Sequence, residues 1–203
     1  MAPTLGTLAF GIGLLAKLAN LAGVTASALG VADYYPFGER NWRYYTHWGL
    51  ETVFNVSLLY VTVTGWNSLG LPLWVLVPAG TVFAVGFAGA LLAGSDLGSD
   101  ETAGLEGELR TDGWYRYSRN PQYVCYAVGM IGFAVLAATP PAIGLCLVAL
   151  PLWFVLPFAE EPWLTEQYGE AYERYADRVP RFLGPASVRA LVNTRTDDSK
   201  RVT

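Results

Sequence analysis

The chain has 203 residues, of which 53% are hydrophobic and only 15% are charged, and its mean hydropathy is +0.31. Soluble domains carry about 25% charged residues, so this composition argues against a soluble globular domain. The net charge of −4 gives no support to a nucleic-acid partner, because binding to a phosphate backbone needs clustered cationic side chains.

The hydrophobic residues gather in five blocks along the chain rather than in amphipathic stripes. A helix of about 17–25 apolar residues crosses a bilayer, and hydrocarbon tolerates no open backbone. We therefore expect an all-α, polytopic membrane bundle of about five transmembrane helices. Pro140 and Pro141 predict a tight hairpin between the last two. The expected spans are residues 8–31, 48–66, 71–94, 122–139 and 141–158.

The basic residues predict the orientation of this bundle. Twelve of the 13 lie between spans one and two, between spans three and four, or after span five, and the exception is Lys17. The positive-inside rule then places the N-terminus outside and the C-terminus in the cytoplasm. We expect residues 1–94 to form three N-terminal spans. Residues 95–186 should form a cytoplasmic loop, the hairpin and an interfacial helix, and residues 187–203 a disordered polar tail.

The loop before span four, "GLEGELRTDGWYRYSRNPQY" at residues 104–123, combines a turn signal with cationic and aromatic side chains. Pro121 suits the first turn of the span, where its missing N–H is harmless. The free N–H groups of that helix start then lie beside Arg119. Tyr115 and Tyr123 offer faces that attract sulfonium or ammonium cations. The loop thus favours a ligand with a carboxylate, a flat base and a cation. The alternative is an interfacial belt of aromatics and snorkelling arginines.

A second polar segment follows span five directly. Glu160 and Glu161 lie at the lip of the membrane, where carboxylates are costly unless they bind something; the alternative is that they cap a following helix. We expect Pro162 to open an amphipathic helix along the interface. Its aromatic stripe is expected to pack rather than to bind a cofactor. The stripe consists of Leu164, Tyr168, Tyr172 and Tyr175.

Two sequence patterns flank the predicted hairpin. Residues 111–123 read T-x-G-x-Y-R-x-x-R-N-P-x-Y, and residues 160–182 read E-E-x-x-L-x-x-x-Y-G-x-x-Y-x-x-Y-x-x-x-V-P-R-F. Together they resemble the isoprenylcysteine carboxyl methyltransferase family and the related phospholipid N-methyltransferases. The resemblance covers about half of the chain, roughly residues 95–183.

The resemblance implies a membrane enzyme that uses S-adenosylmethionine to methylate a lipophilic acceptor. The acceptor would be a prenyl compound, another isoprenoid or a phospholipid, and it would enter from the bilayer; no metal is required. Family members usually carry His at the position of Asn120 and Arg at the position of Leu156, so a prenylcysteine carboxylate is not favoured as the substrate. Carried over residue by residue, the cofactor binders are Glu108, Leu109, Arg110, Tyr115, Asn120, Pro121, Gln122, Tyr123 and Glu160.

The candidate catalytic residues are Glu51, Asn55 and Arg119. Glu51 and Asn55 lie one turn apart near the inner end of span two. They either line the acceptor cavity or form an interhelical hydrogen bond. His47 is either a base or an interfacial residue, and Lys17 receives no assignment. Two rival functions are an NADPH-dependent oxidoreductase of the sterol-reductase type and a non-enzymatic membrane scaffold.

Overall fold

The computed structural model describes residues 4–192, and this part of the chain is helical with no named strand. The expected all-α bundle is therefore confirmed. Three short elements lie between or after the long helices: α4 (Ser99–Thr102), the 3-10 helix η1 (Gly113–Arg116) and α7 (Glu170–Ala176). The long helices are α1 (Leu5–Ala28), α2 (Trp42–Gly65), α3 (Leu73–Leu97), α5 (Pro121–Ala137) and α6 (Pro140–Tyr168).

The five long helices overlap the five spans expected from hydropathy. In the described residues α1, α3 and α6 are each long and apolar enough to cross a membrane, and α5 is apolar with 17 residues. The helix α2 is not among these candidates, and its sequence includes Arg43, His47 and Glu51. These helices identify an integral membrane protein.

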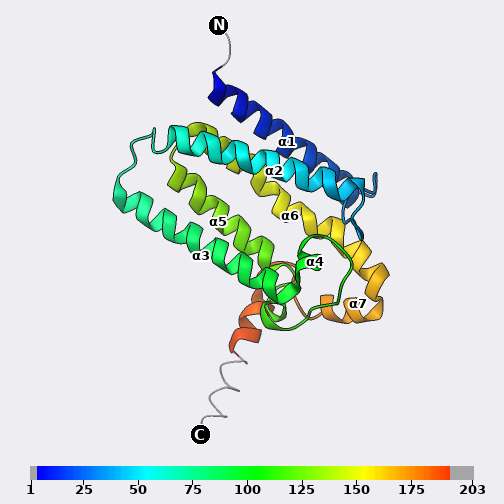
Figure 1. The fold of residues 1–203 in the computed structure, drawn as a ribbon. Coiled ribbons are helices and arrows are strands. Elements are labelled where there is room, and N and C mark those ends of the chain that lie inside the picture. Colours follow the sequence, from blue (N-terminus) through cyan, green and yellow to red (C-terminus); the bar gives the residue numbers. More distant parts are fainter. Residues whose placement is uncertain (1–3, 193–203) are drawn as a thin grey trace.

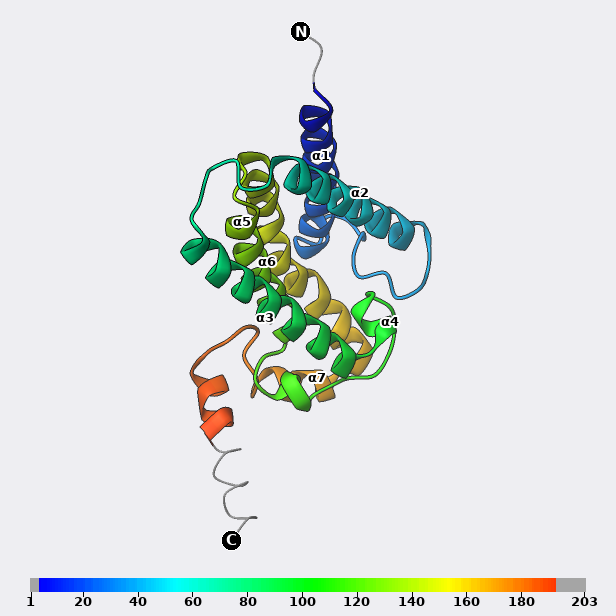
Figure 2. The same cartoon turned by 60° about the vertical axis from the view of Figure 1, so that its left-hand side comes forward.

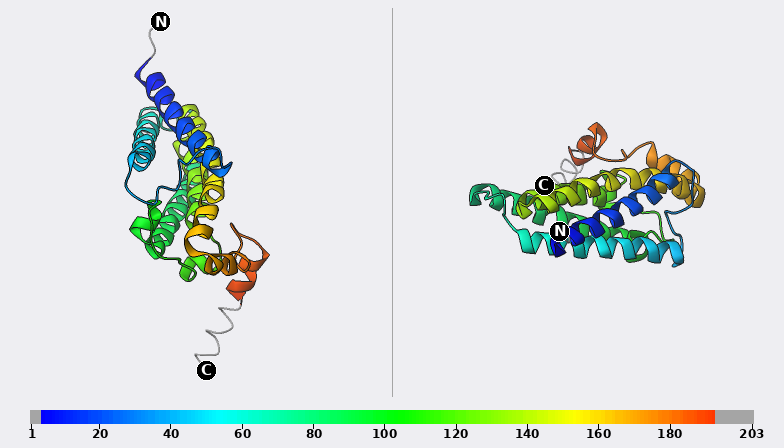
Figure 3. Two further views of the ribbon diagram at one scale, coloured as in Figure 1. Left: turned by 90° about the vertical axis from the view of Figure 1, so that its right-hand side faces the viewer. Right: turned by 90° about the horizontal axis from the view of Figure 1, so that it is seen from above.

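The polar connections lie together at one end of the bundle. Residues 29–41, residues 98–120 and α7 are close to one another in Figures 1 and 3, whereas the start of α1 lies toward the other end. Figure 2 shows α3 alongside α5, and α1 crossing behind α2; α1 also packs on α6. The last two long helices form the expected hairpin, because α5 ends at Ala137 and α6 begins at Pro140.

The last long helix continues further than the sequence predicted. Pro162 lies inside α6, as do Pro151 and Pro157, although an internal proline removes one backbone hydrogen bond and crowds the preceding turn. Packing offsets that cost, because Leu156 and Ala159 lie in one buried cluster. The separate C-terminal helix, α7, begins only after Gly169.

Two predictions about the C-terminal region change as a result. Glu160 and Glu161 lie within α6 rather than ahead of a new helix, so the capping alternative is wrong. The polar tail predicted from residue 187 begins inside a helical stretch at residues 185–192. The remainder of that tail, residues 193–203, lies outside the described residues.

Small residues bring α3 and α5 into close contact. A Cβ atom added to Gly86 would lie 2.5 Å from the backbone nitrogen of Gly129. One added to Gly132 would lie 2.5 Å from the backbone nitrogen of Phe83. Such approach of two backbones is a common packing mode of membrane helices. It fixes α5, whose first turn carries the residues described below.

We predict that Gly86→Ala destabilises the protein, because the added methyl group forces α3 and α5 apart. The expected loss is about 1–3 kcal/mol, typical of overpacking. Gly11→Ala in α1 is the matched control, since nothing lies within 4 Å of the added Cβ atom. Thermal unfolding of both detergent-solubilised variants measures the difference, and equal melting temperatures would contradict the prediction.

Candidate functional site

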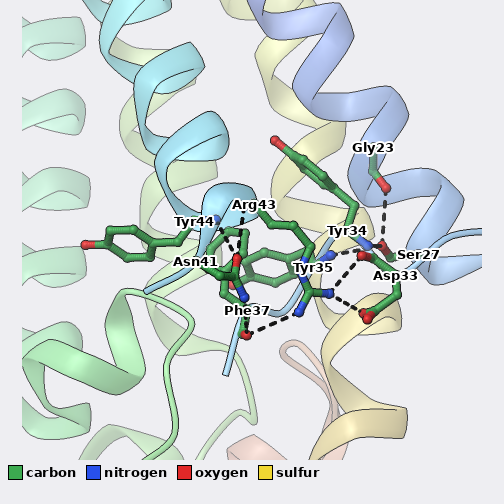
Figure 4. A network of polar contacts seen from close by, with 9 residues as sticks. All are labelled: Gly23, Ser27, Asp33, Tyr34, Tyr35, Phe37, Asn41, Arg43 and Tyr44. Atoms are coloured by element: carbon green, nitrogen blue, oxygen red, sulfur yellow. Dashed lines mark hydrogen bonds and ion pairs between the residues drawn. The ribbon is translucent and has the colours of Figure 1, made fainter. Parts of the chain in front are cut away.

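The connection between α1 and α2 is fixed by side-chain hydrogen bonds to its backbone (Figure 4). The hydroxyl oxygen of Ser27 accepts from the backbone N–H groups of Tyr34 and Tyr35, at 2.9 and 3.0 Å. The guanidinium of Arg43 pairs with the Asp33 carboxylate at 2.6 Å and donates to the carbonyl of Phe37 at 3.4 Å. These contacts hold Tyr35 in a defined place.

The same connection is bonded to the loop that follows α3. The backbone N–H groups of Phe37 and Gly38 both donate to the carbonyl of Gly104 at 3.1 Å. In return the N–H of Glu106 donates to the carbonyl of Gly38 at 2.9 Å. Two segments more than sixty residues apart therefore form one wall at the polar end of the bundle.

The carboxylate of Glu160 is the point at which three segments meet. Its Oε1 accepts hydrogen bonds of 2.5 Å from the hydroxyls of both Tyr35 and Tyr123. The two hydroxyls lie 3.3 Å apart. Burial first, and then the Glu160 carboxylate, raise the pKa of Tyr35 well above its ordinary value of 10. Tyr35 therefore keeps its proton at neutral pH and remains a donor to this carboxylate.

The neighbouring Glu161 carboxylate joins the two sequence patterns. It pairs with Arg119 at 3.0 Å, and Arg181 donates to it through Nε at 2.8 Å and through Nη2. The backbone N–H of Arg119 also donates to the carbonyl of Pro180 at 2.9 Å, and the Asn120 amide donates to that of Arg181 at 3.0 Å. The Nε of Arg119 is buried without a partner in the described part of the chain. The N–H at this Nε is therefore available to a ligand.

A cluster of tyrosines packs beside these charges. Tyr115, Tyr172 and Tyr175 are all buried, and the hydroxyl of Tyr175 donates to the carbonyl of Tyr115 at 2.7 Å. Burial, followed by the Glu161 carboxylate, raises the pKa of Tyr172 to about 12. Leu164 and Tyr168 pack at the edge of the same cluster. All four residues of the stripe also line the cavity described next, so the stripe both packs and faces that space.

These segments enclose a cavity of about 90 Å³, the polar cavity, whose lining includes six charged side chains. It brings together eight of the nine residues assigned to the cofactor by resemblance. The ninth, Pro121, is buried in the first turn of α5, as its sequence position predicted, and does not line the cavity. Arg119 does line it. The eight are Glu108, Leu109, Arg110, Tyr115, Asn120, Gln122, Tyr123 and Glu160.

A second, apolar cavity of about 500 Å³ adjoins the first. Side chains of α2, α3, α5 and α6 line it, and most of its walls are aromatic or aliphatic. Thr102, Gln122 and Tyr123 line both cavities. The two spaces therefore meet at the first turn of α5, which carries Gln122 and Tyr123.

Glu51 lies in the wall of a cavity and also takes part in an interhelical contact. Glu51 and Asn55 line the apolar cavity, and Glu51 also bonds across to α1. The ammonium of Lys17 donates to its two oxygens at 2.6 and 2.7 Å, and the Asn20 amide donates at 2.7 Å. Asn55 donates instead to the backbone carbonyl of Glu51 at 2.8 Å, within α2.

Sequence reasoning missed two members of the polar network. Tyr35 lies in the connection between α1 and α2, and nothing local in "YYPFGER" indicates that its hydroxyl reaches Glu160. Arg181 was recognised within a motif but not as a partner of Glu161. The signal available for both was an acid pair that required partners. Within residues 4–192 there is no group of three or more His, Cys, Asp or Glu side chains placed to hold a metal ion.

Comparison with known families matches one segment of the chain. Searches of curated proteins and of solved structures gave no match. The matched segment, residues 74–171, covers 98 of the 203 residues and contains all nine residues assigned to the cofactor. This segment, which runs from α3 into α7, matches the phospholipid methyltransferase family, and the expected resemblance to membrane methyltransferases is confirmed over these residues.

Proposed function

We propose that the protein is a membrane methyltransferase that binds S-adenosylmethionine in the polar cavity and a lipophilic acceptor in the apolar cavity. The observation that carries the proposal is the adjacency of the two spaces at Gln122 and Tyr123. A charged donor and an apolar acceptor need different surroundings but must meet at one point. Methyl transfer depends mainly on positioning the two reactants in a space with little water.

The residues of the polar cavity fit this cofactor. The unpartnered Nε of Arg119 suits a carboxylate, since guanidinium groups bind carboxylates strongly. The tyrosine faces and the carboxylates of Glu108 and Glu160 suit a ligand with a sulfonium and an ammonium group. When bound, S-adenosylmethionine supplies an electrophilic methyl group. The protein's own groups orient the ligand and exclude water.

The loop after α3 controls access to this cavity in the proposed function. Several residues between Glu101 and Arg110 line one side of the cavity. Glu101 accepts from the backbone N–H of Glu108 at 3.0 Å, and the hydroxyl of Tyr168 donates to the carbonyl of Gly107 at 2.8 Å. At about 90 Å³ the space is smaller than most ligand pockets, so a nucleotide enters as this loop moves outward to the cytoplasm.

The acceptor has a separate route in this proposal. The apolar cavity is lined by exposed side chains of α2 and α3, among them Leu59 and Phe87. Those helices are apolar on their outer faces, so the opening between them faces lipid. An acceptor that resides in the bilayer enters there without crossing water.

The test of the function is methyl labelling. Purified protein is incubated with S-adenosylmethionine carrying a tritiated methyl group and with a total lipid extract, and the labelled lipid is isolated. A labelled lipid supports the proposal. Binding of NADPH in place of S-adenosylmethionine would favour a reductase, and binding of neither would favour a scaffold.

We predict that Glu160→Gln weakens S-adenosylmethionine binding by about tenfold or more. The amide loses the charge that a cationic ligand needs, and hydrogen bonds to charged groups contribute about 1.5–3 kcal/mol. Glu166→Gln, an exposed position on the same helix, is the matched control and should bind normally. Calorimetric titration of the detergent-solubilised protein measures both. Equal affinities would remove Glu160 from the site.

We also predict that Tyr35→Phe weakens the same binding by about fivefold. The change deletes one of the two tyrosine hydrogen bonds to Glu160, and a single hydrogen bond contributes about 1 kcal/mol. Tyr45→Phe near the start of α2 is the control, because Tyr45 is 63% exposed. A Tyr35→Phe variant with unchanged affinity would show that the α1–α2 connection does not shape the cofactor site.

A further inference from the structure

Within residues 4–192, the wall of the apolar cavity carries no unpaired charge that could bind a charged ligand. Among the described residues that line it, only Lys17 and Glu51 are charged. Lys17 is 1% exposed and donates to both oxygens of Glu51. The Asn20 amide donates to the same carboxylate. The two charges thus neutralise each other, and the wall of the cavity is electrically balanced.

This balance disfavours a ligand with a charged head. An anionic group would compete with Glu51 for Lys17 and would leave a buried carboxylate uncompensated. A cationic group would compete with Lys17 for Glu51 and would leave a buried ammonium group uncompensated. Breaking a buried ion pair in this way is strongly destabilising. A phosphate group would meet the same obstacle, because the cavity wall offers it no second cation.

Uncharged hydrogen-bonding groups are nevertheless available on the same wall. His47 is 5% exposed and lines the cavity, and its Nδ1 is buried without a partner in the described part of the chain. The indole nitrogen of Trp153, which also lines the cavity, is likewise unpartnered. A neutral imidazole offers one donor and one acceptor, and an indole N–H offers a donor. Buried polar atoms without partners are rare in native structures.

These groups lie close to the place where the two cavities meet. The ring of His47 stacks on that of Tyr35, with centroids 5.5 Å apart and planes inclined by 27°. Tyr35 in turn bonds to Glu160 and lies 3.3 Å, hydroxyl to hydroxyl, from Tyr123. Trp153 lies against Tyr123 with centroids 5.9 Å apart. A polar head bound to His47 or Trp153 is therefore near the boundary with the polar cavity.

We infer that the acceptor is an uncharged lipid alcohol, whose hydroxyl bonds to His47 and whose apolar body lies against the aromatic wall. This inference rests on the proposed function and narrows its substrate class. A hydroxyl both donates and accepts, which matches the free groups of His47 and Trp153. The body of the acceptor contacts side chains such as Phe54, Phe83 and Phe133. A phospholipid, with its charged phosphate, does not fit this cavity.

The test compares three probes that share one chain and differ in head charge. Farnesol, farnesoic acid and farnesylamine are titrated at pH 7.5 into the full-length protein in detergent, without S-adenosylmethionine. The acid is then anionic and the amine cationic. Trp48 and Trp153 line the cavity, so intrinsic fluorescence reports occupancy. Farnesol should bind at least tenfold more tightly than either charged probe, and dioleoylphosphatidylethanolamine should not displace it.

Two variants at one position assign the preference to His47. His47→Phe should weaken farnesol binding about tenfold and leave binding of the acid unchanged. His47→Gln, which retains hydrogen-bonding groups, should restore part of the affinity and keeps the test valid should the Phe variant fail to fold. Tighter binding of a charged probe, displacement by the phospholipid, no binding of any probe, or unaltered farnesol affinity in both variants would overturn the inference.

The test of the acceptor and the test of the methyltransferase function can fail independently. Calorimetric binding of S-adenosylmethionine is measured on the same preparation. Donor binding without a preference for farnesol overturns only the assignment of the acceptor. A preference for farnesol without donor binding overturns only the methyltransferase proposal.

Discussion

The carboxylate of Glu160 is the interaction on which the polar end of the molecule depends. It accepts from Tyr35 in the α1–α2 connection and from Tyr123 in the first turn of α5. A carboxylate near hydrocarbon is costly unless its oxygens are bonded. The two hydrogen bonds hold Tyr35 and Tyr123 against α6. The segments that carry these residues therefore lie beside the polar cavity. Removing this acid would break the hydrogen bond from Tyr35 that joins the α1–α2 connection to α6.

The same constraint shapes the middle of the bundle. Lys17 of α1 is buried at a depth where an unpaired ammonium group would be strongly unfavourable, and Glu51 of α2 is placed to neutralise it. This pair fixes α2 against α1, while glycines fix α3 against α5. Each pair of helices is thus stabilised by contacts between its own two members. The space left between the two pairs is the apolar cavity, which is lined by residues of all five long helices.

The sequence predicted the parts of this structure that depend on local chemistry. Hydropathy located the five long helices, and Pro121 marked the start of α5 because a proline tolerates the first turn of a helix. The resemblance carried by the two motifs implied nine cofactor binders, and eight of them line one cavity. The sequence did not predict contacts between segments that lie far apart in the chain. Neither the bond from Tyr35 to Glu160, 125 residues apart, nor the Lys17–Glu51 pair has a local signature. Pro162 misled for the opposite reason, since tertiary packing overrode a strong local signal.

The dual position of Glu51 connects these observations. As the partner of Lys17 it stabilises the bundle, and as a wall of the apolar cavity it sets the charge that a ligand encounters. A free carboxylate there would select cations, and a free ammonium group would select anions. Because the two groups are paired, the wall attracts neither cations nor anions. In the proposed function, compensation of this buried charge leaves the recognition of the acceptor to uncharged groups such as His47, so the pair that stabilises the bundle also bears on which ligand the cavity accepts.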